Sequence, residues 1–319
     1  MTGKARDRRA VVTVPRHIQD ESAGDRLRRW ADEWRQMAGV ALARSEGPKT
    51  GQIYDIVGTQ NLFGEESLFI NFGYWRNKPT TLDEASRDLA RLVAQSAEFK
   101  SSDVIVDCGP GYGDQDILWI NEFGPKHITG VNLATEQISI ATRRVAEAGL
   151  SHRIDYVNAS ATDLPLDDRS CTKVVALESA FHFPSRVDFF TEALRVLKPG
   201  GRLVTADIVP KRTVLNAWAR SEVARRGWRK ASRRAVRGAV DLAGYRDLLL
   251  DVGFAEAVTR SITDDVYLPL AKFLRNRLSD PDMRHVNPVI RYSFTPLGFR
   301  LTTLQSDYIV AVAQKAKKR

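Results

Sequence analysis

One ten-residue stretch, Val104 to Gly113, restricts the possible folds of this chain more than any other. It reads V-I-V-D-C-G-P-G-Y-G, three apolar β-formers followed by an acid and three spaced glycines. The apolar run predicts a strand buried on both faces. The glycine turn lets the backbone approach a ligand closely, and a helix over 116–122 would offer that ligand its free N–H groups. Strand, turn and helix together open a nucleotide-binding α/β unit.

The spacing of the glycines limits the kind of ligand. A dinucleotide fingerprint, G-x-G-x-x-G, would need its third glycine where Asp114 stands, and a carboxylate there would repel a pyrophosphate. A P-loop needs Gly-Lys followed by Ser or Thr, but Gly113 is followed by Asp114 and Gln115. The pattern D-x-G-x-G-x-G instead suits a ligand that lacks phosphates and carries a positive centre.

Strand and helix patterns alternate after this unit, which predicts a doubly wound α/β fold with a seven-stranded, mostly parallel sheet. Ligands of such sheets bind at the carboxyl ends of the strands. The expected strands are 104–107, 127–131, 153–158, 173–177, 202–207, 257–262 and 307–313, and the expected helices among them are 135–147, 186–196 and 245–254.

The chain divides into four regions on these patterns. Residues 1–99 form a helical N-terminal extension and lid, with amphipathic helices expected over 25–43 and 81–95. Residues 100–210 form the ligand-binding core. Residues 211–250 form a basic helical cap after the fifth strand, and residues 251–319 supply the C-terminal strands that complete the core.

The net charge of +9 is concentrated in one segment. Residues 211–237 contain ten Lys or Arg and one acid, Glu222, so this segment carries the whole excess and the rest of the chain is neutral. Three interpretations stay open: a solvated helix face, a site for an anionic group of the substrate such as a diphosphate, and a contact with nucleic acid or an acidic membrane surface.

Cysteine usage and hydropathy favour a cytoplasmic protein. Cys108 and Cys171 are far apart and have no metal-ligand spacing, so we expect two reduced, buried thiols and no metal site. No apolar run approaches the ~18–20 residues of a membrane span, and the basic start of the chain lacks the apolar core of a secretory signal.

An aromatic segment over 54–75 precedes the core and ends in N-F-G-Y-W at 71–75. One interpretation is simple packing of a lid against the main domain. The other is a gate in which Tyr74 touches the ligand, since flat aromatic rings attract cationic centres through cation–π contact.

The glycine pattern resembles motif I of the class I S-adenosylmethionine-dependent methyltransferases. Four further signatures of that family follow in order, and with N-F-G-Y-W upstream they resemble the branch that acts on natural products, including macrolide sugar O-methyltransferases and terpenoid or polyketide C-methyltransferases. These signatures are T-G-V-N-L at 129–133 with Gln137, S-A-T-D-L-P-L at 160–166, V-V-A-L-E-S-A-F-H-F at 174–183, and L-R-V-L-K-P-G-G-R-L-V-T-A-D at 194–207.

The resemblance implies S-adenosylmethionine as the cofactor and S-adenosylhomocysteine as the product. It assigns the methionine end to an acid and to glycine backbone, the ribose to the end of the second strand, and the adenine to the loop after the third. Two departures occur, because Asn132 replaces the usual ribose-binding acid and Ser160 replaces the usual adenine-binding acid. The implied cofactor-binding residues are Tyr74, Asp107, Gly109, Gly111, Gly113, Asn132, Leu133, Gln137, Ser160 and Ala161.

Methyl transfer to a hydroxyl needs alignment and a base. His182, just past the fourth strand, is the first candidate, because an imidazole titrates near neutral pH. Asp207, at the end of the fifth strand, would orient the imidazole or bind the acceptor. Glu178 is the rival base and would suit proton loss after methylation of carbon.

The predicted function is therefore transfer of a methyl group to a hydroxyl or carbon of a small natural-product acceptor. A nucleic-acid methyltransferase that uses 211–237 is one alternative, but the N/D-P-P-Y/F segment of base-amine enzymes is absent, since Glu178-Ser-Ala-Phe stands there. A protein that binds S-adenosylmethionine without transferring its methyl group, such as a cyclase, is another. No nucleic-acid partner is expected, and a homo-oligomer is left open.

Overall fold

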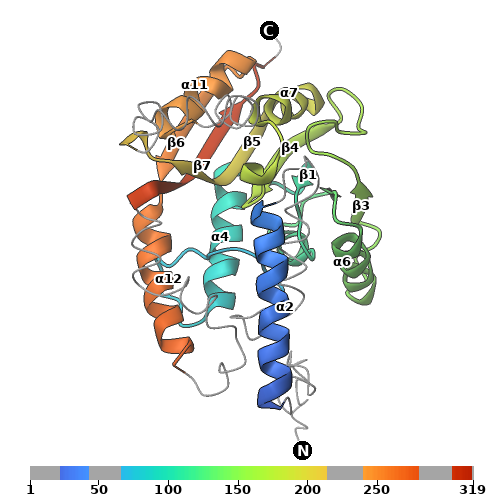
Figure 1. Cartoon of the computed structure of the whole chain (residues 1–319). Helices are drawn as coiled ribbons and strands as arrows, with labels where there is room; N and C mark the ends of the chain where they lie inside the picture. The colour runs from blue at the N-terminus through green and yellow to red at the C-terminus, as the bar shows by residue number, and fades with distance from the viewer. Residues whose placement is uncertain (1–21, 43–65, 214–239, 280–303, 318–319) are drawn as a thin grey trace, which may run out of the picture.

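The computed structural model describes residues 22–42, 66–213, 240–279 and 304–317. A seven-stranded sheet with strand order β3-β2-β1-β4-β5-β7-β6 forms the centre of the molecule (Figure 1). Six strands run parallel to one another, while β7 pairs antiparallel with both β5 and β6. The predicted seven-stranded, mostly parallel α/β sheet is confirmed.

The strands lie close to their predicted positions. Strands β4 and β5 begin two and five residues earlier than expected, and β5 includes the Pro-Gly-Gly sequence that was expected to precede it. The bounds are β1 Val104–Cys108, β2 His127–Asn132, β3 Ile154–Asn158, β4 Cys171–Leu177, β5 Leu197–Pro210, β6 Glu256–Ser261 and β7 Ser306–Gln314.

The helices were also predicted in most cases, apart from shifts of one to three residues at their ends. They are α2 Ala23–Leu42, α4 Leu82–Ala97, α5 Asp114–Phe123, α6 Thr135–Glu147, η1 Ala180–His182, α7 Arg186–Val196, α11 Leu242–Val252 and α12 Thr263–Arg277. Most of the predicted basic cap lies outside the described residues. No helix of the described residues is long and apolar enough to cross a membrane.

Helix α12 was not predicted, and Pro269 in its interior explains why. A proline inside a helix removes one N–H donor, so the carbonyl four residues earlier loses its helical partner. That carbonyl belongs to Asp265, and it accepts a hydrogen bond from the Trp75 N–H at 2.8 Å. A distant segment therefore satisfies the group that the proline leaves free, a compensation that sequence periodicity does not reveal.

Successive side chains of the central strands pack alternately into two separate hydrophobic cores. Ile105, Val175 and Val204 belong to the core beneath α4, α5 and α12. Their neighbours Val106 and Val174 point to the opposite core, beneath α7 and α11. Figure 1 shows these helices on the two sides of the sheet. Burial on both faces fixes the register of the strands, since a slip by one residue would reverse every side chain.

The close approach of β2 to β3 generates a prediction about Gly130. A Cβ at this position would lie 2.4 Å from Tyr156 Cδ1 and 3.0 Å from Pro110 Cγ. The Tyr156 ring is held by its hydroxyl, which donates to Asp116 at 3.0 Å. Because the ring has no room to withdraw, we expect Gly130→Ala to lower the free energy of unfolding by about 1–3 kcal/mol in urea titrations.

Gly24→Ala is the matched control. A Cβ there meets only Ser22 Oγ at 3.9 Å, and alanine favours a helix over glycine. If both variants kept the stability of the parent protein, the packing of Gly130 against Tyr156 would not be the constraint that the contact suggests.

Candidate functional site

The turn after β1 lies at the carboxyl edge of the sheet and packs tightly on both sides. A Cβ at Gly109, whose φ is +92°, would lie 2.4 Å from Ser179 Cβ, and one at Gly113, whose φ is +82°, would lie 2.4 Å from the Tyr156 hydroxyl oxygen. At Gly111 the nearest atom is Ile70 Cδ1 at 3.7 Å. The outer glycines are therefore packed tightly against neighbouring elements, whereas a Cβ at Gly111 would fit beside Ile70 at an ordinary van der Waals distance.

Asp107 is fully buried beneath this turn. Its Oδ2 accepts a hydrogen bond from Gln115 Nε2 at 2.9 Å, and burial raises its pKa to about 7. Asp116, also fully buried, accepts from the Tyr156 hydroxyl and lies close enough to Asp107 for each carboxyl to shift the pKa of the other. Asp116 and Tyr156 were not among the predicted site residues, because neither belongs to the glycine motif.

At the end of β2, Asn132 and Gln137 form a pair with defined amide orientations. The Ala134 N–H donates to Asn132 Oδ1 at 3.2 Å, and a backbone N–H can only donate, so the other atom of the Asn132 amide is nitrogen. This Nδ2 donates to Gln137 Oε1 at 2.8 Å. The groups left for a ligand are therefore N–H donors: the second Nδ2 hydrogen and the Gln137 Nε2.

The loops beside this pair hold the remaining predicted contacts. Leu133 directly follows β2 and is 60% exposed. Ser160 accepts from the Thr162 N–H and pairs with Asp163 in an isolated bridge, which folds the loop after β3 into a tight turn. Ala161 in this turn is buried.

Residues 66–75, here called the crossing segment, connect the turn after β1 to the end of β4. Three carboxylates from different elements accept its backbone N–H groups. Asp83 accepts from Ser67 at 2.9 Å, Asp114 from Leu68 at 3.3 Å, and Glu178 from Phe72 at 2.6 Å. A segment without helix or strand is thereby fixed beside the glycine turn.

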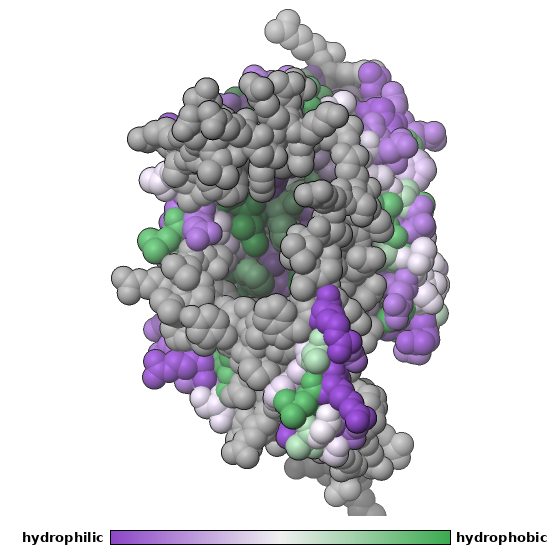
Figure 2. Space-filling model, viewed as in Figure 1, coloured by the Kyte–Doolittle hydropathy of each residue, from purple (hydrophilic) through white to green (hydrophobic). Residues whose placement is uncertain are grey.

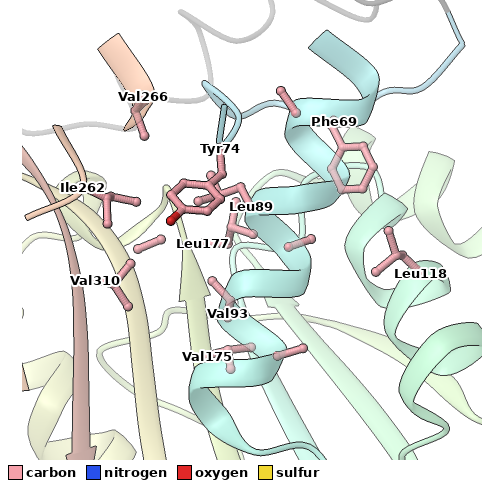
Figure 3. Close-up of a cluster of buried hydrophobic side chains, with 14 of the residues drawn as sticks. Phe69, Tyr74, Leu89, Val93, Leu118, Val175, Leu177, Ile262, Val266 and Val310 are labelled. Carbon is pink, nitrogen blue, oxygen red and sulfur yellow. The ribbon is translucent and has the colours of Figure 1, made fainter. Parts of the chain in front are cut away.

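The Tyr74 ring lies in the apolar core rather than open to solvent. It is 6% exposed and packs among Leu89, Leu177, Ile262 and Val310 (Figure 3). The packing role that the sequence allowed for this segment is therefore visible, and a contact of Tyr74 with a cofactor stays a prediction. Near the centre of the face shown in Figure 2, apolar residues of the described part of the chain are visible.

Glu178 directly follows β4 in a left-handed conformation, with φ at +50°. Its Oε1 accepts from the Phe72 N–H and from the Tyr308 hydroxyl, each at 2.6 Å. Both bonds favour the carboxylate, but burial outweighs them and raises the pKa of Glu178 to about 7. Glu178 thus holds the crossing segment and β7 together at the carboxyl edge of the sheet.

His182 ends the short helix η1 and is half-buried, with its ring against that of Phe181. Burial lowers the pKa of His182 to about 4, although the charge of Asp207 opposes this shift. The imidazole is therefore neutral at physiological pH, with a ring nitrogen free of a proton, although burial weakens it as a base. Its N–H backbone group donates to the carbonyl of Ser179, the residue that packs on Gly109.

Asp207 is fully buried in β5 and forms an ion pair with Arg186. Arg186 Nε donates to Asp207 Oδ2 at 2.9 Å, and its Nη2 also donates to the Ile208 carbonyl at 3.2 Å. This pair acts on His182 with opposite charges, since Arg186 lowers and Asp207 raises the histidine pKa. Arg186 was not predicted as a site residue, because nothing in the sequence pairs the start of α7 with β5.

The family profile described as "Methyltransferase domain" matches residues 106–205. Erythromycin 3''-O-methyltransferase of Saccharopolyspora erythraea is 29% identical over 82% of this chain and 88% of its own length. An O-methyltransferase of Aspergillus nomiae is 31% identical over 50% of this chain and 71% of its own. These matches place the glycine turn and the β4 and β5 ends in a methyltransferase core.

Among solved structures, the [4+2]-cyclase SpnF superposes with a TM-score of 0.62 and 21% identity, covering 85% of this chain and 96% of that one. This likeness shows the fold. Methyltransferases of the same fold have been solved with S-adenosylmethionine or S-adenosylhomocysteine bound. The chain therefore belongs to the class I S-adenosylmethionine-dependent methyltransferases of natural-product metabolism, and it transfers a methyl group from S-adenosylmethionine to a hydroxyl or carbon of a small-molecule acceptor.

Proposed function

We propose that this enzyme methylates a hydroxyl group, with His182 as the general base. The observation that carries the proposal is a neutral, half-buried imidazole on the loop that packs against the cofactor turn through Ser179. Support comes also from the O-methyltransferase that matches most of the chain. The acceptor that fits this likeness is a macrolide or related product with a free sugar hydroxyl.

The residues at the carboxyl edge fit S-adenosylmethionine. Gly111 is packed less tightly than Gly109 and Gly113, so its backbone is the part of the turn that the methionine end can approach most easily. The Asn132–Gln137 pair presents N–H groups that can donate to ribose hydroxyl oxygens. The acids Asp107 and Glu178 place negative charge near a ligand that carries a positive sulfonium. When bound, the cofactor supplies a methyl group on a positively charged sulfur. The sulfur leaves as a neutral thioether, so no general acid is needed.

The roles of the protein side chains follow from these contacts. His182 takes the acceptor proton as the new oxygen–carbon bond forms, and the imidazolium that results lies near the carboxylate of Asp207. Arg186 holds Asp207 and limits its pull on the imidazole, so Asp207 is a positioning residue rather than a base. Glu178 fixes the crossing segment and thereby shapes the wall next to the acceptor.

A methylated carbon with Glu178 as base is the second candidate. A carboxylate whose pKa is about 7 is a stronger base than an imidazole whose pKa is about 4. However, Glu178 Oε1 already accepts two hydrogen bonds, from Phe72 and Tyr308. We further propose that the basic residues 211–237 bind an anionic group of the acceptor. Most of that segment lies outside the described residues.

The function is tested with S-adenosylmethionine labelled in its methyl group. We expect label to pass to a macrolide with a free sugar hydroxyl and to appear as a methoxy signal by NMR. A labelled C-methyl product would overturn hydroxyl methylation in favour of the Glu178 mechanism. Tight cofactor binding without transfer to any hydroxyl-bearing or enol acceptor would contradict both mechanisms.

The pH dependence of kcat/KM separates the two bases. A base must be deprotonated to act, so a His182 with a pKa near 4 gives a rate that is flat across about pH 6 to 8. A Glu178 base with a pKa of about 7 would instead lose activity as the pH falls through that value. We expect the flat profile, and a break near neutral pH that disappears in Glu178→Gln would refute it.

Substitution of the two residues tests the same assignment. His182→Ala should lower turnover by roughly 10²–10⁴-fold and leave the Kd of S-adenosylhomocysteine nearly unchanged. Glu178→Gln is the matched variant, because its amide oxygen still accepts from the Phe72 N–H and the Tyr308 hydroxyl. We expect it to retain at least about a tenth of the activity, since one ordinary hydrogen-bond contribution corresponds to that factor.

Cofactor affinity should depend on Gln137. Gln137→Ala removes a donor from the ribose site and leaves Asn132 Nδ2 without its partner, so the Kd of S-adenosylhomocysteine should rise about tenfold in calorimetry. Glu136→Ala, on the exposed side of the same helix, is the control. Equal affinities of the two variants would remove Gln137 from the cofactor site.

A further inference from the structure

Beneath the glycine turn, four side chains form a closed polar cluster in the core. Asp107, at the end of β1, and Asp116, in the first turn of α5, are both 0% exposed. Gln115 donates to one oxygen of Asp107, and Tyr156 from β3 donates to one oxygen of Asp116. The two carboxyl groups lie close enough together that each shifts the pKa of the other, and a hydrogen bond between them requires a proton on one of them.

The number of donors shows that this cluster contains a proton. Oδ1 of Asp107 and Oδ1 of Asp116 are both buried and have no ordinary donor among the described residues. Two ionised carboxylates cannot hydrogen-bond, and burying two negative charges in contact is strongly unfavourable. One proton shared between Asp107 and Asp116 satisfies both atoms and leaves one negative charge.

The position of the shared proton gives it a mechanical role. Asp107 precedes Gly109 by two residues and Asp116 follows Gly113 by three, so their bond ties together the two ends of the turn. Tyr156 supports the same turn from below, since its hydroxyl lies where a Cβ of Gly113 would be. Opening the bond between the carboxyls would release both ends of the backbone that faces the cofactor.

We propose that Asp116 is a positioning residue for cofactor binding: the proton that it shares with Asp107 holds the glycine turn in its binding conformation, and loss of this proton at alkaline pH weakens binding. The proposal rests on S-adenosylmethionine as the cofactor and is independent of which residue is the base.

The groups packed around the pair leave its shared proton as the one whose loss would change this region as the pH rises. Asp114 on α5 is ion-paired with Arg144 from α6, with 2.8 Å between Arg144 Nη2 and Asp114 Oδ1. Burial raises the pKa of the Cys108 thiol and of the Tyr156 hydroxyl well above their usual range, so both stay neutral. Burial also raises the pKa of Asp107 to about 7, and burial together with the neighbouring Asp107 raises the pKa of Asp116 well above its usual range.

The test compares the pH dependence of S-adenosylhomocysteine binding in full-length wild type and Asp116→Asn, by calorimetry at about pH 7.5 and 9.5. Asparagine keeps the shape and supplies a permanent N–H donor to Asp107. We expect Asp116→Asn to bind like wild type at the lower pH. Between the two pH values, the Kd of wild type should rise about tenfold more than that of the variant. Titration of the ligand's own amino group affects both proteins equally and cancels in this comparison.

Three further variants complete the test. Asp251→Asn, an exposed acid on α11, should follow wild type at both pH values. Tyr156→Phe and Asp116→Ala should weaken binding already at the lower pH, because each leaves a buried carboxyl oxygen without a donor. If Asp116→Ala does not fold, Asp116→Asn and Tyr156→Phe still test whether the pair holds the glycine turn.

Two outcomes would overturn the proposal. One is an equal pH dependence of wild type and Asp116→Asn, and the other is weak binding of Asp116→Asn at the lower pH with an unchanged melting temperature. Failure of wild type to bind S-adenosylhomocysteine at either pH would instead contradict the cofactor assignment, so the two failures are distinguishable.

Discussion

At Gly109 the backbone comes so close to Ser179 that no side chain fits between them. The contact joins the turn after β1 to the loop after β4, and these two strands are neighbours in the sheet because the chain reverses its order there. In doubly wound folds ligands bind at such a reversal. The contact therefore has two consequences: it requires a glycine at this position of the turn after β1, and it brings Glu178 and His182 to the same edge of the sheet. The remaining parts of the site are arranged around this junction.

Acidic side chains fasten the irregular segments to this junction. Asp83, Asp114 and Glu178 each accept N–H groups of the crossing segment, which has no ladder of its own. A buried backbone N–H without a partner is costly, so these bonds determine the path of the segment. Trp75 shows the converse case: its backbone N–H donates to the Asp265 carbonyl, which has no helical donor because of Pro269. The wall of the site is thus assembled from side chain to backbone contacts across distant parts of the chain.

The sequence predicts the parts of this arrangement that repeat along the chain. Apolar runs predicted the central strands β1 and β4, because a strand buried on both faces must be almost continuously apolar, and the glycine pattern located the turn. The unpredicted parts depend on contacts between distant residues. The ion pair of Arg186 with Asp207 and the bond of Asp116 with Asp107 join different elements, and neither residue type at those positions signals a partner. Helix α12 was missed for the same reason, since the group that compensates for Pro269 lies nearly two hundred residues earlier.

The burial of acids around the site bears on the chemistry of a sulfonium. The positive charge on sulfur is present before methyl transfer and absent afterwards, so a fully ionised acidic site would stabilise the reactant more than the transition state and slow the reaction. Here the negative charge of the acids is reduced or paired. Asp107 and Asp116 share a proton, Asp207 is paired with Arg186, and burial raises the pKa of Glu178 to about 7. The site retains enough negative charge to attract a cationic cofactor while each carboxylate is either partly protonated or held by a donor. Charge that is held in this way orients the reactants without binding the sulfonium so tightly that transfer becomes slow.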